Sequence, residues 1–219
     1  MASTPDEIRQ MLASDAYEQR LRAINHLAEI DKDIAFDLVQ TVLDDSKARV
    51  RYAAVSKLAT VGVANPQKSL ELLRHALLTD DEADVRAAAA DAIGALHLKD
   101  GFDDLKTMYY ETSDWIIQLS IVAALGELGD SRGFEILEHA LGGSNDLLHA
   151  IAVGALGELG DRRAVPLLLE QCTNADWQVR YRVAQALGHF DGAEVESALG
   201  QLSQDSVEQI AEEAKSHLA

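Results

Sequence analysis

The sequence predicts an all-α protein, an α-solenoid in which about seven helix pairs stack into a curved superhelix. Alanine and leucine dominate the composition, whereas proline occurs 3 times and aromatic residues make up 5% of the chain. Such a composition has high helix propensity, and no segment shows the alternation typical of strands. A fixed period of 20 to 50 residues predicts stacked repeats. One apolar position recurs here at spacings of 31, 35, 32, 31, 31 and 31 residues, at Leu27, Leu58, Ile93, Leu125, Leu156, Leu187 and Leu218.

The segment 161–188 shows the pattern of one repeat. Its first half is an apolar run that Asp161 opens, and Pro166 lies early in the expected helix, where a missing N–H group costs little. In the second half Asp176 can accept hydrogen bonds from the first turn of another helix, which Gly188 ends. The expected buried face of that helix consists of residues one helical turn apart: Val179, Val183, Ala186 and Leu187.

The first three pairs follow the same pattern with different lengths. A short helix from Pro5 to Ala13 begins the first pair, which we expect to cap the N-terminal end of the stack. The second pair ends at Gly62, and the turn-forming residues in 63–66 explain the one long spacing. The third pair has a second helix rich in alanine, which allows neighbouring helices to approach closely.

The last four pairs differ mainly in their surfaces. The fourth is rich in aromatic residues, and Trp115 opens its second helix. The fifth has Gly142 and Gly143 in its internal turn, and the last is strongly acidic, as suits a terminal repeat that faces water. No change of composition interrupts the period, so we expect a single domain over residues 1–219. The repeats are expected at about 4–30, 31–62, 63–97, 98–129, 130–160, 161–191 and 192–219.

Charge and composition exclude several classes of function. With 19 basic and 37 acidic residues the formal net charge is −18, which disfavours nucleic acid and anionic membrane surfaces as partners. No apolar segment is long enough for membrane insertion, and the N-terminal residues lack the pattern of a signal peptide, so we expect a cytoplasmic protein. The single cysteine, Cys172, excludes an internal disulfide. The seven histidines are scattered, and we expect neither a metal site nor any of the familiar catalytic motifs.

One position of the second helix is mostly arginine. We interpret this position as a structural ladder in which the arginines bridge neighbouring repeats, with Asp176, Glu82 or Asp84 as expected partners. The interruptions at Gln118 and His149 either are relaxed rungs of the ladder or mark a place where function replaced structure. The position is occupied in turn by Arg20, Arg51, Arg86, Gln118, His149, Arg180 and Ala211.

Aromatic residues also recur at equivalent positions. Trp115 and Trp177 both follow an aspartate at the start of a second helix, and Tyr52 and Tyr181 each follow an arginine of the ladder position. These side chains either pack between repeats or line an inner groove, where they would hold a partner protein or a flat conjugated ligand that bears carboxylates. The candidate binding residues are Trp115, Trp177, Tyr181, Arg180, Arg182, Tyr52, His149 and Gln118.

Two segments resemble a known family. They read Asp-Trp-Gln-Val-Arg-Tyr-Arg-Val-Ala-Gln-Ala-Leu-Gly over 176–188 and Val-Arg-Tyr-Ala-Ala-Val over 50–55. They are similar to the short HEAT-like repeats of the phycobilin lyases of the E/F type, and the resemblance extends over nearly the whole chain. The segment 114–135 is similar to the HEAT-like proteins that act in cyanobacterial phycobilisome degradation.

The resemblance implies a cytosolic cyanobacterial protein that binds phycobiliproteins, such as phycocyanin or allophycocyanin, and detaches or handles their bilin chromophores. It implies no tightly bound cofactor, although a bilin, which is flat and carries two propionates, would be a ligand. Release of a thioether-linked bilin by elimination needs binding and proton transfer, and His149 is a candidate proton donor. Two alternatives remain, an E/F-type lyase subunit that attaches bilins and a non-enzymatic adaptor. The sequence does not decide between them, nor does it give the oligomeric state.

Overall fold

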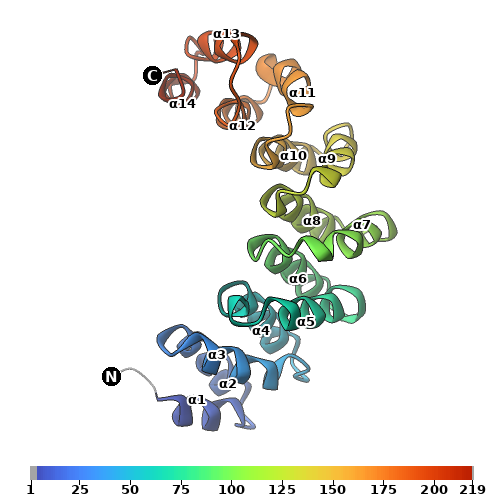
Figure 1. Cartoon of the computed structure of the whole chain (residues 1–219), viewed down its shortest axis with the longest axis vertical. Helices are drawn as coiled ribbons and strands as arrows, with labels where there is room; N and C mark the ends of the chain where they lie inside the picture. Colours follow the sequence, from blue (N-terminus) through green and yellow to red (C-terminus); the bar gives the residue numbers. More distant parts are fainter. Residues whose placement is uncertain (1–3, 219) are drawn as a thin grey trace. The chain divides into compact units, whose positions relative to one another are not determined.

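A computed structural model describes residues 4–218, which are helical throughout apart from short connections (Figure 1). These residues form 14 α-helices and no strand, in agreement with the predicted all-α fold. The chain divides by its internal contacts into two compact units, residues 1–121 and 122–219, which are described separately below. The prediction of a single domain remains a prediction. Among the described residues no helix is both long and apolar enough to cross a bilayer.

The first unit contains three complete helix pairs and most of a fourth. Pro5 and Pro66 each occupy the first position of a helix, and the side chains of Thr4 and Asn65 accept hydrogen bonds from the first turns of those helices. The pairs are α1 (Pro5–Leu12) with α2 (Tyr17–His26), α3 (Lys32–Val39) with α4 (Ala48–Val61), α5 (Pro66–Thr79) with α6 (Ala83–Ala95), and α7 (Phe102–Glu111) with α8 (Trp115–Leu128).

The boundary between the units falls within α8, and the second unit continues with three further pairs. They are α9 (Phe134–Leu141) with α10 (Asp146–Leu159), α11 (Ala164–Glu170) with α12 (Trp177–Leu187), and α13 (Ala193–Leu202) with α14 (Glu208–Ser216). Seven pairs therefore follow one another along the chain, as the period predicts. Short 3₁₀ turns extend or connect helices at Leu27–Glu29, Gln40–Val42, Gly62–Ala64, Lys99–Gly101, Ser131–Gly133 and Gln171–Thr173.

The periodic apolar position forms the centre of the core in each unit. Leu27, Leu58 and Ile93 are at most 1% exposed in the first unit, and Leu125, Leu156 and Leu187 are equally buried in the second. The last marker differs, because Leu218 is 42% exposed beyond the end of α14 and no further repeat covers it within the described residues.

One local expectation needs correction, and a second is confirmed with a particular backbone geometry. The first concerns Asp161, which does not begin a helix: its side chain accepts a hydrogen bond from the backbone N–H of Arg163 at 3.0 Å, and the turn that results delays the start of α11 to Ala164. The second concerns Gly188, which follows α12 as predicted but keeps a right-handed φ of −61°. A Cβ atom at Gly188 would collide with the ring of His217, which follows α14, so a larger residue there would have to displace that side chain.

Glycines allow consecutive second helices of the second unit to approach very closely. A Cβ atom at Gly157 of α10 would lie 2.5 Å from the Cα atom of Ala186 in α12, and one at Gly126 would lie 2.8 Å from the Cα atom of Ala155. Real Cβ atoms do not approach backbone atoms so closely, so no other residue fits without moving a helix. The alternation of Gly and Ala between neighbouring repeats therefore determines the spacing of these helices.

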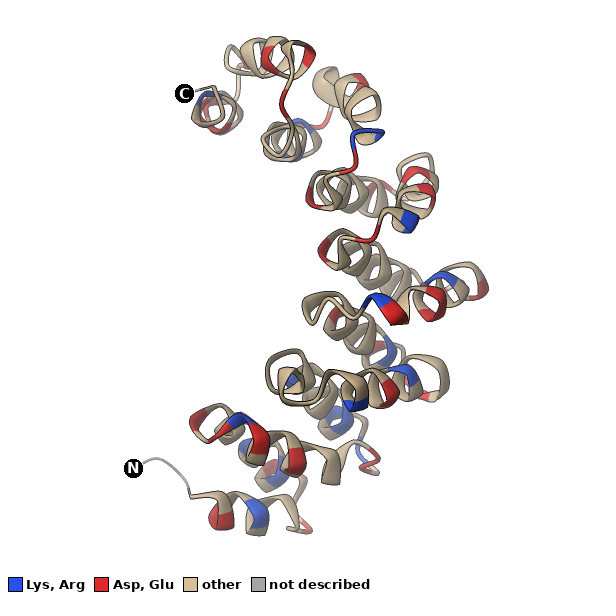
Figure 2. Cartoon of the chain, in the orientation of Figure 1, with Lys and Arg blue, Asp and Glu red and all other residues tan. Residues whose placement is uncertain are grey.

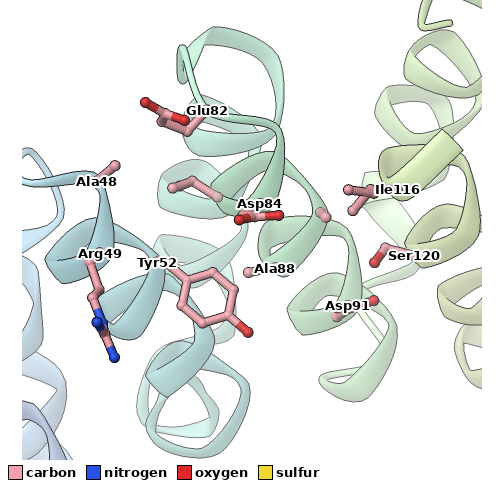
Figure 3. Close-up of a pocket in the computed structure, with 11 residues that line it drawn as sticks. Ala48, Arg49, Tyr52, Glu82, Asp84, Ala88, Asp91, Ile116 and Ser120 are labelled. Carbon is pink, nitrogen blue, oxygen red and sulfur yellow. The ribbon is translucent and has the colours of Figure 1, made fainter. Parts of the chain in front are cut away.

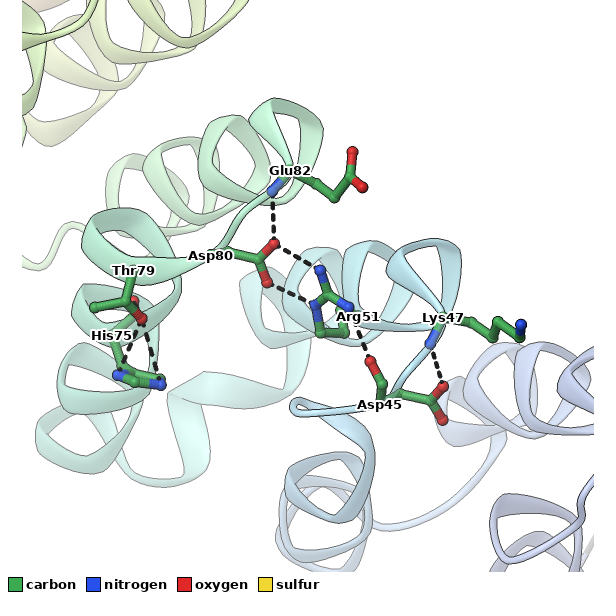
Figure 4. A network of polar contacts seen from close by, with 7 residues as sticks. All are labelled: Asp45, Lys47, Arg51, His75, Thr79, Asp80 and Glu82. Carbon is green, nitrogen blue, oxygen red and sulfur yellow. Dashed lines mark hydrogen bonds and ion pairs between the residues drawn. The ribbon is translucent and has the colours of Figure 1, made fainter.

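The arginine position forms the predicted ladder. Three of the four arginines reach back to backbone carbonyls of their own repeat and forward to an aspartate of the next repeat, as Arg51 does with Asp45 O and the Asp80 carboxylate (Figure 4). The partners, however, are not the predicted ones: they are aspartates in the turn between the two helices of the following repeat. The three ion pairs of this type are Arg20–Asp45, Arg51–Asp80 and Arg180–Asp205.

These ion pairs make stability depend on pH. Hydrogen bonds from Arg51 and Arg180 lower the pKa values of Asp80 and Asp205 below the ordinary value of aspartate. The unfolded chain then binds protons more readily than the native protein, so this stabilisation is complete above the ordinary aspartate pKa and is lost as the pH falls below about 4. Urea unfolding at several pH values should show this loss, and an Arg51→Met/Arg180→Met variant should show a smaller one. Equal pH dependence in both proteins would contradict the assignment.

Candidate binding groove

An open groove of about 480 Å³ lies on the second helices of the last three repeats. Helix α12 packs between α10 and α14, and the groove crosses the exposed faces of all three. Aromatic, apolar and amide side chains surround a single guanidinium group. The lining residues are Leu147, Ala150, Trp177, Gln178, Tyr181, Arg182, Gln185 and Gln209.

Trp177 is held at the edge of the groove by the start of α12. The side chain of Asp176 accepts a hydrogen bond from the Gln178 backbone N–H at 2.8 Å, which fixes the first turn of the helix. Trp177 occupies the first position of this helix and is 43% exposed, and Leu147 on α10 is 48% exposed. Large apolar side chains that remain this accessible on one groove are available for a ligand or a partner.

Tyr181 lies one helical turn after Trp177 and connects the groove to α14. Its hydroxyl group donates a hydrogen bond to Glu213 Oε2 at 3.2 Å, and Glu213 Oε1 lies 3.1 Å from His217 Nε2. The negative charge of Glu213 and this hydrogen bond raise the pKa of Tyr181, so the phenol stays protonated at neutral pH. Sequence reasoning missed Glu213 and His217. The feature of the sequence that could have indicated them is their position: they lie four residues apart, one repeat after Tyr181.

Arg182 and Arg180, adjacent in sequence, have different environments. Arg182 is exposed and lines the groove. Arg180 points to the other side of α12, where Nε and a terminal nitrogen bind the Asp205 carboxylate at 2.7 and 3.1 Å. Of the predicted site residues in the second unit, the structure thus brings together Trp177, Tyr181 and Arg182, and places Arg180 in the ladder.

The two interruptions of the arginine position also have ladder geometry. Gln118 Nε2 donates to the backbone oxygens of Tyr109 and Thr112 at 3.4 and 3.2 Å, like an arginine that reaches back to its own repeat. His149 Nδ1 lies 2.7 Å from Leu141 O, and its Nε2 lies 3.2 Å from Gln171 Oε1. The Nδ1 contact lies within the repeat of His149 and the Nε2 contact reaches the next repeat, an arrangement that favours the interpretation as a relaxed rung over proton donation.

Tyr52 and Trp115 belong to the first unit. Tyr52 is 47% exposed and lines a second groove, of about 560 Å³, on α4, α6 and the start of α8 (Figure 3). Trp115 is 51% exposed at the first position of α8 and lines neither groove. Tyr52, Trp115 and Trp177 are thus exposed, whereas Tyr181 is partly buried, and the four aromatic residues do not all share one groove.

Two further groups bear on chemistry. Cys172 is partly buried, its Sγ atom lies 3.7 Å from Leu168 O, and burial raises the pKa of its thiol, so it is a poor nucleophile at neutral pH. Within residues 4–218 no three His, Cys, Asp or Glu side chains are grouped so that they could hold a metal ion.

Comparison with known families decides the class of the protein. A family model described as HEAT repeats matches residues 5–94, 70–150 and 137–219, which together span almost the whole chain. The chain belongs to the HEAT-repeat family. A search of curated proteins finds no match.

Solved structures of other HEAT-repeat proteins have the same fold. The complex of CpcE and CpcF of phycocyanin lyase from Nostoc sp. PCC7120 is similar over 99% of this chain and 94% of the other, with 18% identity and a TM-score of 0.65. YibA of Escherichia coli covers 98% of this chain and 80% of its own, with 19% identity and a TM-score of 0.66. An archaeal HEAT-like repeats protein from Thermococcus onnurineus NA1 covers 99% and 96%, with 15% identity and a TM-score of 0.58. At these identities the similarity shows the fold.

Proposed function

We propose that this HEAT-repeat protein binds phycobiliproteins and detaches or handles their bilin chromophores, as a phycobilisome-degradation factor similar to NblB. The observation that carries the proposal is the groove of α10, α12 and α14, in which accessible aromatic and apolar side chains surround Arg182. The likeness to phycocyanin lyase over 99% of the chain supports it at the level of the fold.

The groove has the chemistry that a bilin requires. A bilin offers a flat conjugated surface, which can stack on the indole of Trp177, and propionate groups, which a guanidinium such as that of Arg182 binds with two parallel hydrogen bonds. Leu147 provides an apolar contact on the α10 side. The volume of about 480 Å³ is within the range of small-molecule sites. An open groove also leaves room for the protein to which the bilin is attached.

Detachment would be an elimination at the thioether bond to the antenna cysteine. The carbon–sulfur bond breaks, the bilin loses a proton as a new double bond forms, and the sulfur recovers a proton as a thiol. The groove contributes binding and orientation, and the Tyr181 hydroxyl group, which donates a hydrogen bond to Glu213, is a polar group of its lining. No nucleophile is needed, in keeping with the high pKa of Cys172.

Incubation of the purified protein with phycocyanin tests the proposal. After separation, bilin absorbance is followed on phycocyanin, on this protein and in the free fraction. Release or transfer of the bilin supports detachment, and uptake of free bilin onto phycocyanin lacking its chromophore would instead indicate a lyase. Co-elution with an unchanged chromophore would indicate an adaptor, and the absence of any interaction would contradict the assignment to the antenna.

Substitution in the groove should weaken bilin binding. Trp177→Ala and Arg182→Gln are each expected to lower the affinity for biliverdin about tenfold, because they remove the stacking surface and the propionate contact. Absorbance titration measures this, and circular dichroism checks the fold. Trp115→Ala is the matched comparison, since it removes an equally accessible indole from the equivalent position of α8. An equal loss with Trp115→Ala would show that accessible indoles in general, and not this groove, determine the affinity, and would contradict the assignment. Unchanged affinity in both groove variants would overturn the bilin site.

A further inference from the structure

The groove of the first unit differs in chemistry from the groove of the second, although both lie on equivalent helix faces. Its floor is formed by small and apolar residues of α6, including Ala87 and Ala88, and Ile116 and Ser120 close its α8 side (Figure 3). It has a volume of about 560 Å³ and is open to solvent along its length. Whereas the groove of the second unit contains a guanidinium and no carboxylate, this groove is lined by three carboxylates.

The negative charge of this groove is concentrated along α6. Glu82 lies just before the helix, and Asp84 and Asp91 lie on the helix seven residues apart, which corresponds to about 10 Å along the axis. Arg49 also contributes to the lining, but its guanidinium points away from Asp84 along α4 (Figure 3). Acidic residues without Lys or Arg also occur on α9, α10 and α13 of the second unit (Figure 2).

An accessible aromatic ring stands beside these carboxylates. Tyr52 on α4 is 47% exposed, and its ring extends into the groove next to the carboxylate of Asp84 (Figure 3). An aromatic face attracts a Lys or Arg head group electrostatically, and a neighbouring carboxylate adds a charge-assisted hydrogen bond. The apolar floor can meanwhile accept the aliphatic stem of such a side chain.

We propose that the groove of the first unit binds an extended segment of a partner protein that carries arginine or lysine side chains. Asp84 and Tyr52 receive one cationic side chain, and Asp91 lines the same groove two helical turns further along. The openness of the groove fits a chain that passes through it, and the separation of the carboxylates is too large for one metal ion. This surface is independent of the bilin groove, because its residues belong to the other unit.

Peptide titration tests this proposal. The probe is a fluorescein-labelled peptide of three Arg-Pro-Ala units, whose extended polyproline conformation repeats its side chains about every 9 Å. The reference peptide contains citrulline, which keeps the size of arginine and removes its charge. Fluorescence anisotropy in 150 mM NaCl should show binding of the arginine peptide only. Asp84→Asn should weaken binding about fivefold and Tyr52→Ala about threefold.

Matched variants separate the groove from the general negative charge of the protein. Asp37→Asn removes the same charge from the exposed face of α3, the first helix of the repeat that carries Tyr52, and should leave the affinity unchanged. Equal effects of Asp37→Asn and Asp84→Asn, or equal binding of the two peptides, would overturn the proposal. Sedimentation of the unliganded protein provides the remaining test: self-association that Asp84→Asn abolishes would assign the groove to a second copy of the chain and would also overturn it. Circular dichroism confirms that each variant is folded.

Discussion

Replacement of Gly157 by alanine should lower the free energy of unfolding by about 3 kcal/mol. The added methyl group would lie 2.5 Å from the Cα atom and 2.6 Å from the Cβ atom of Ala186 in the next repeat. Backbone cannot move aside as a flexible side chain can, so the whole contact between α10 and α12 has to open. Urea unfolding followed by circular dichroism measures the change.

Gly200→Ala is the matched control, and it should have the opposite sign. Gly200 lies inside α13, and a Cβ atom there would meet nothing within 4 Å. Alanine has the higher helix propensity, so the substitution should stabilise the protein by up to about 1 kcal/mol. If both variants changed stability in the same direction, close packing would not be the reason for glycine at position 157.

Arg51→Met should destabilise the protein by about 3 kcal/mol, because it leaves the buried carboxylate of Asp80 without its cation. The side chains of Arg51 and Asp80 are 17% and 9% exposed, and two hydrogen bonds of 2.7 and 2.8 Å join them. Methionine keeps most of the apolar stem of arginine, so the loss reports mainly on the uncompensated charge. Thermal and urea unfolding at pH 7 provide the measurement.

Two further variants identify the cause of that loss. Arg86 has the same position in the next repeat but contacts Leu77 O and the sulfur of Met108. Arg86→Met should therefore cost only about 1 kcal/mol, the usual contribution of a hydrogen bond. The double variant Arg51→Met/Asp80→Leu removes both charges and should recover most of the stability. A double variant as unstable as the single one would show that packing, and not the buried charge, explains the effect.

The fold could be predicted from the sequence because the same helix-pair pattern recurs seven times along the chain. Leu27 through Leu187 mark the same buried position in six consecutive pairs, and the structure confirms the all-α repeat fold. The sequence analysis did not identify the partners of the arginines, although the sequence shows them at a regular spacing. Each arginine that forms an interrepeat ion pair has an aspartate 25 or 29 residues further along, before the next second helix, and Arg86, Gln118 and His149 have none in that register.

The groove followed from the sequence only in part. The repeat spacing placed Trp115 and Trp177 at equivalent positions. The environment of each indole, however, depends on the side chains of the neighbouring repeats, which the spacing does not determine. Trp177 has Leu147 on the preceding second helix and Gln209 on the following one, and together they form a groove. The hydrogen bond from Tyr181 to Glu213 joins residues 32 apart, and its partner choice depends on rotamers that periodicity does not determine.

The contacts of α14 link ligand binding to the order of the last repeat. Tyr181 and Arg180 of α12, and Gly188 directly after it, each contact the last repeat, through Glu213, Asp205 and His217 respectively. Within the described residues the last pair contacts a neighbouring repeat on one side only, so fewer interrepeat contacts oppose its local opening. Because Gln209 lines the groove, local unfolding of the last helix pair removes part of the binding site. A ligand that binds only the complete groove stabilises the C-terminal repeat by mass action. Ligand binding and folding of this repeat are therefore thermodynamically coupled.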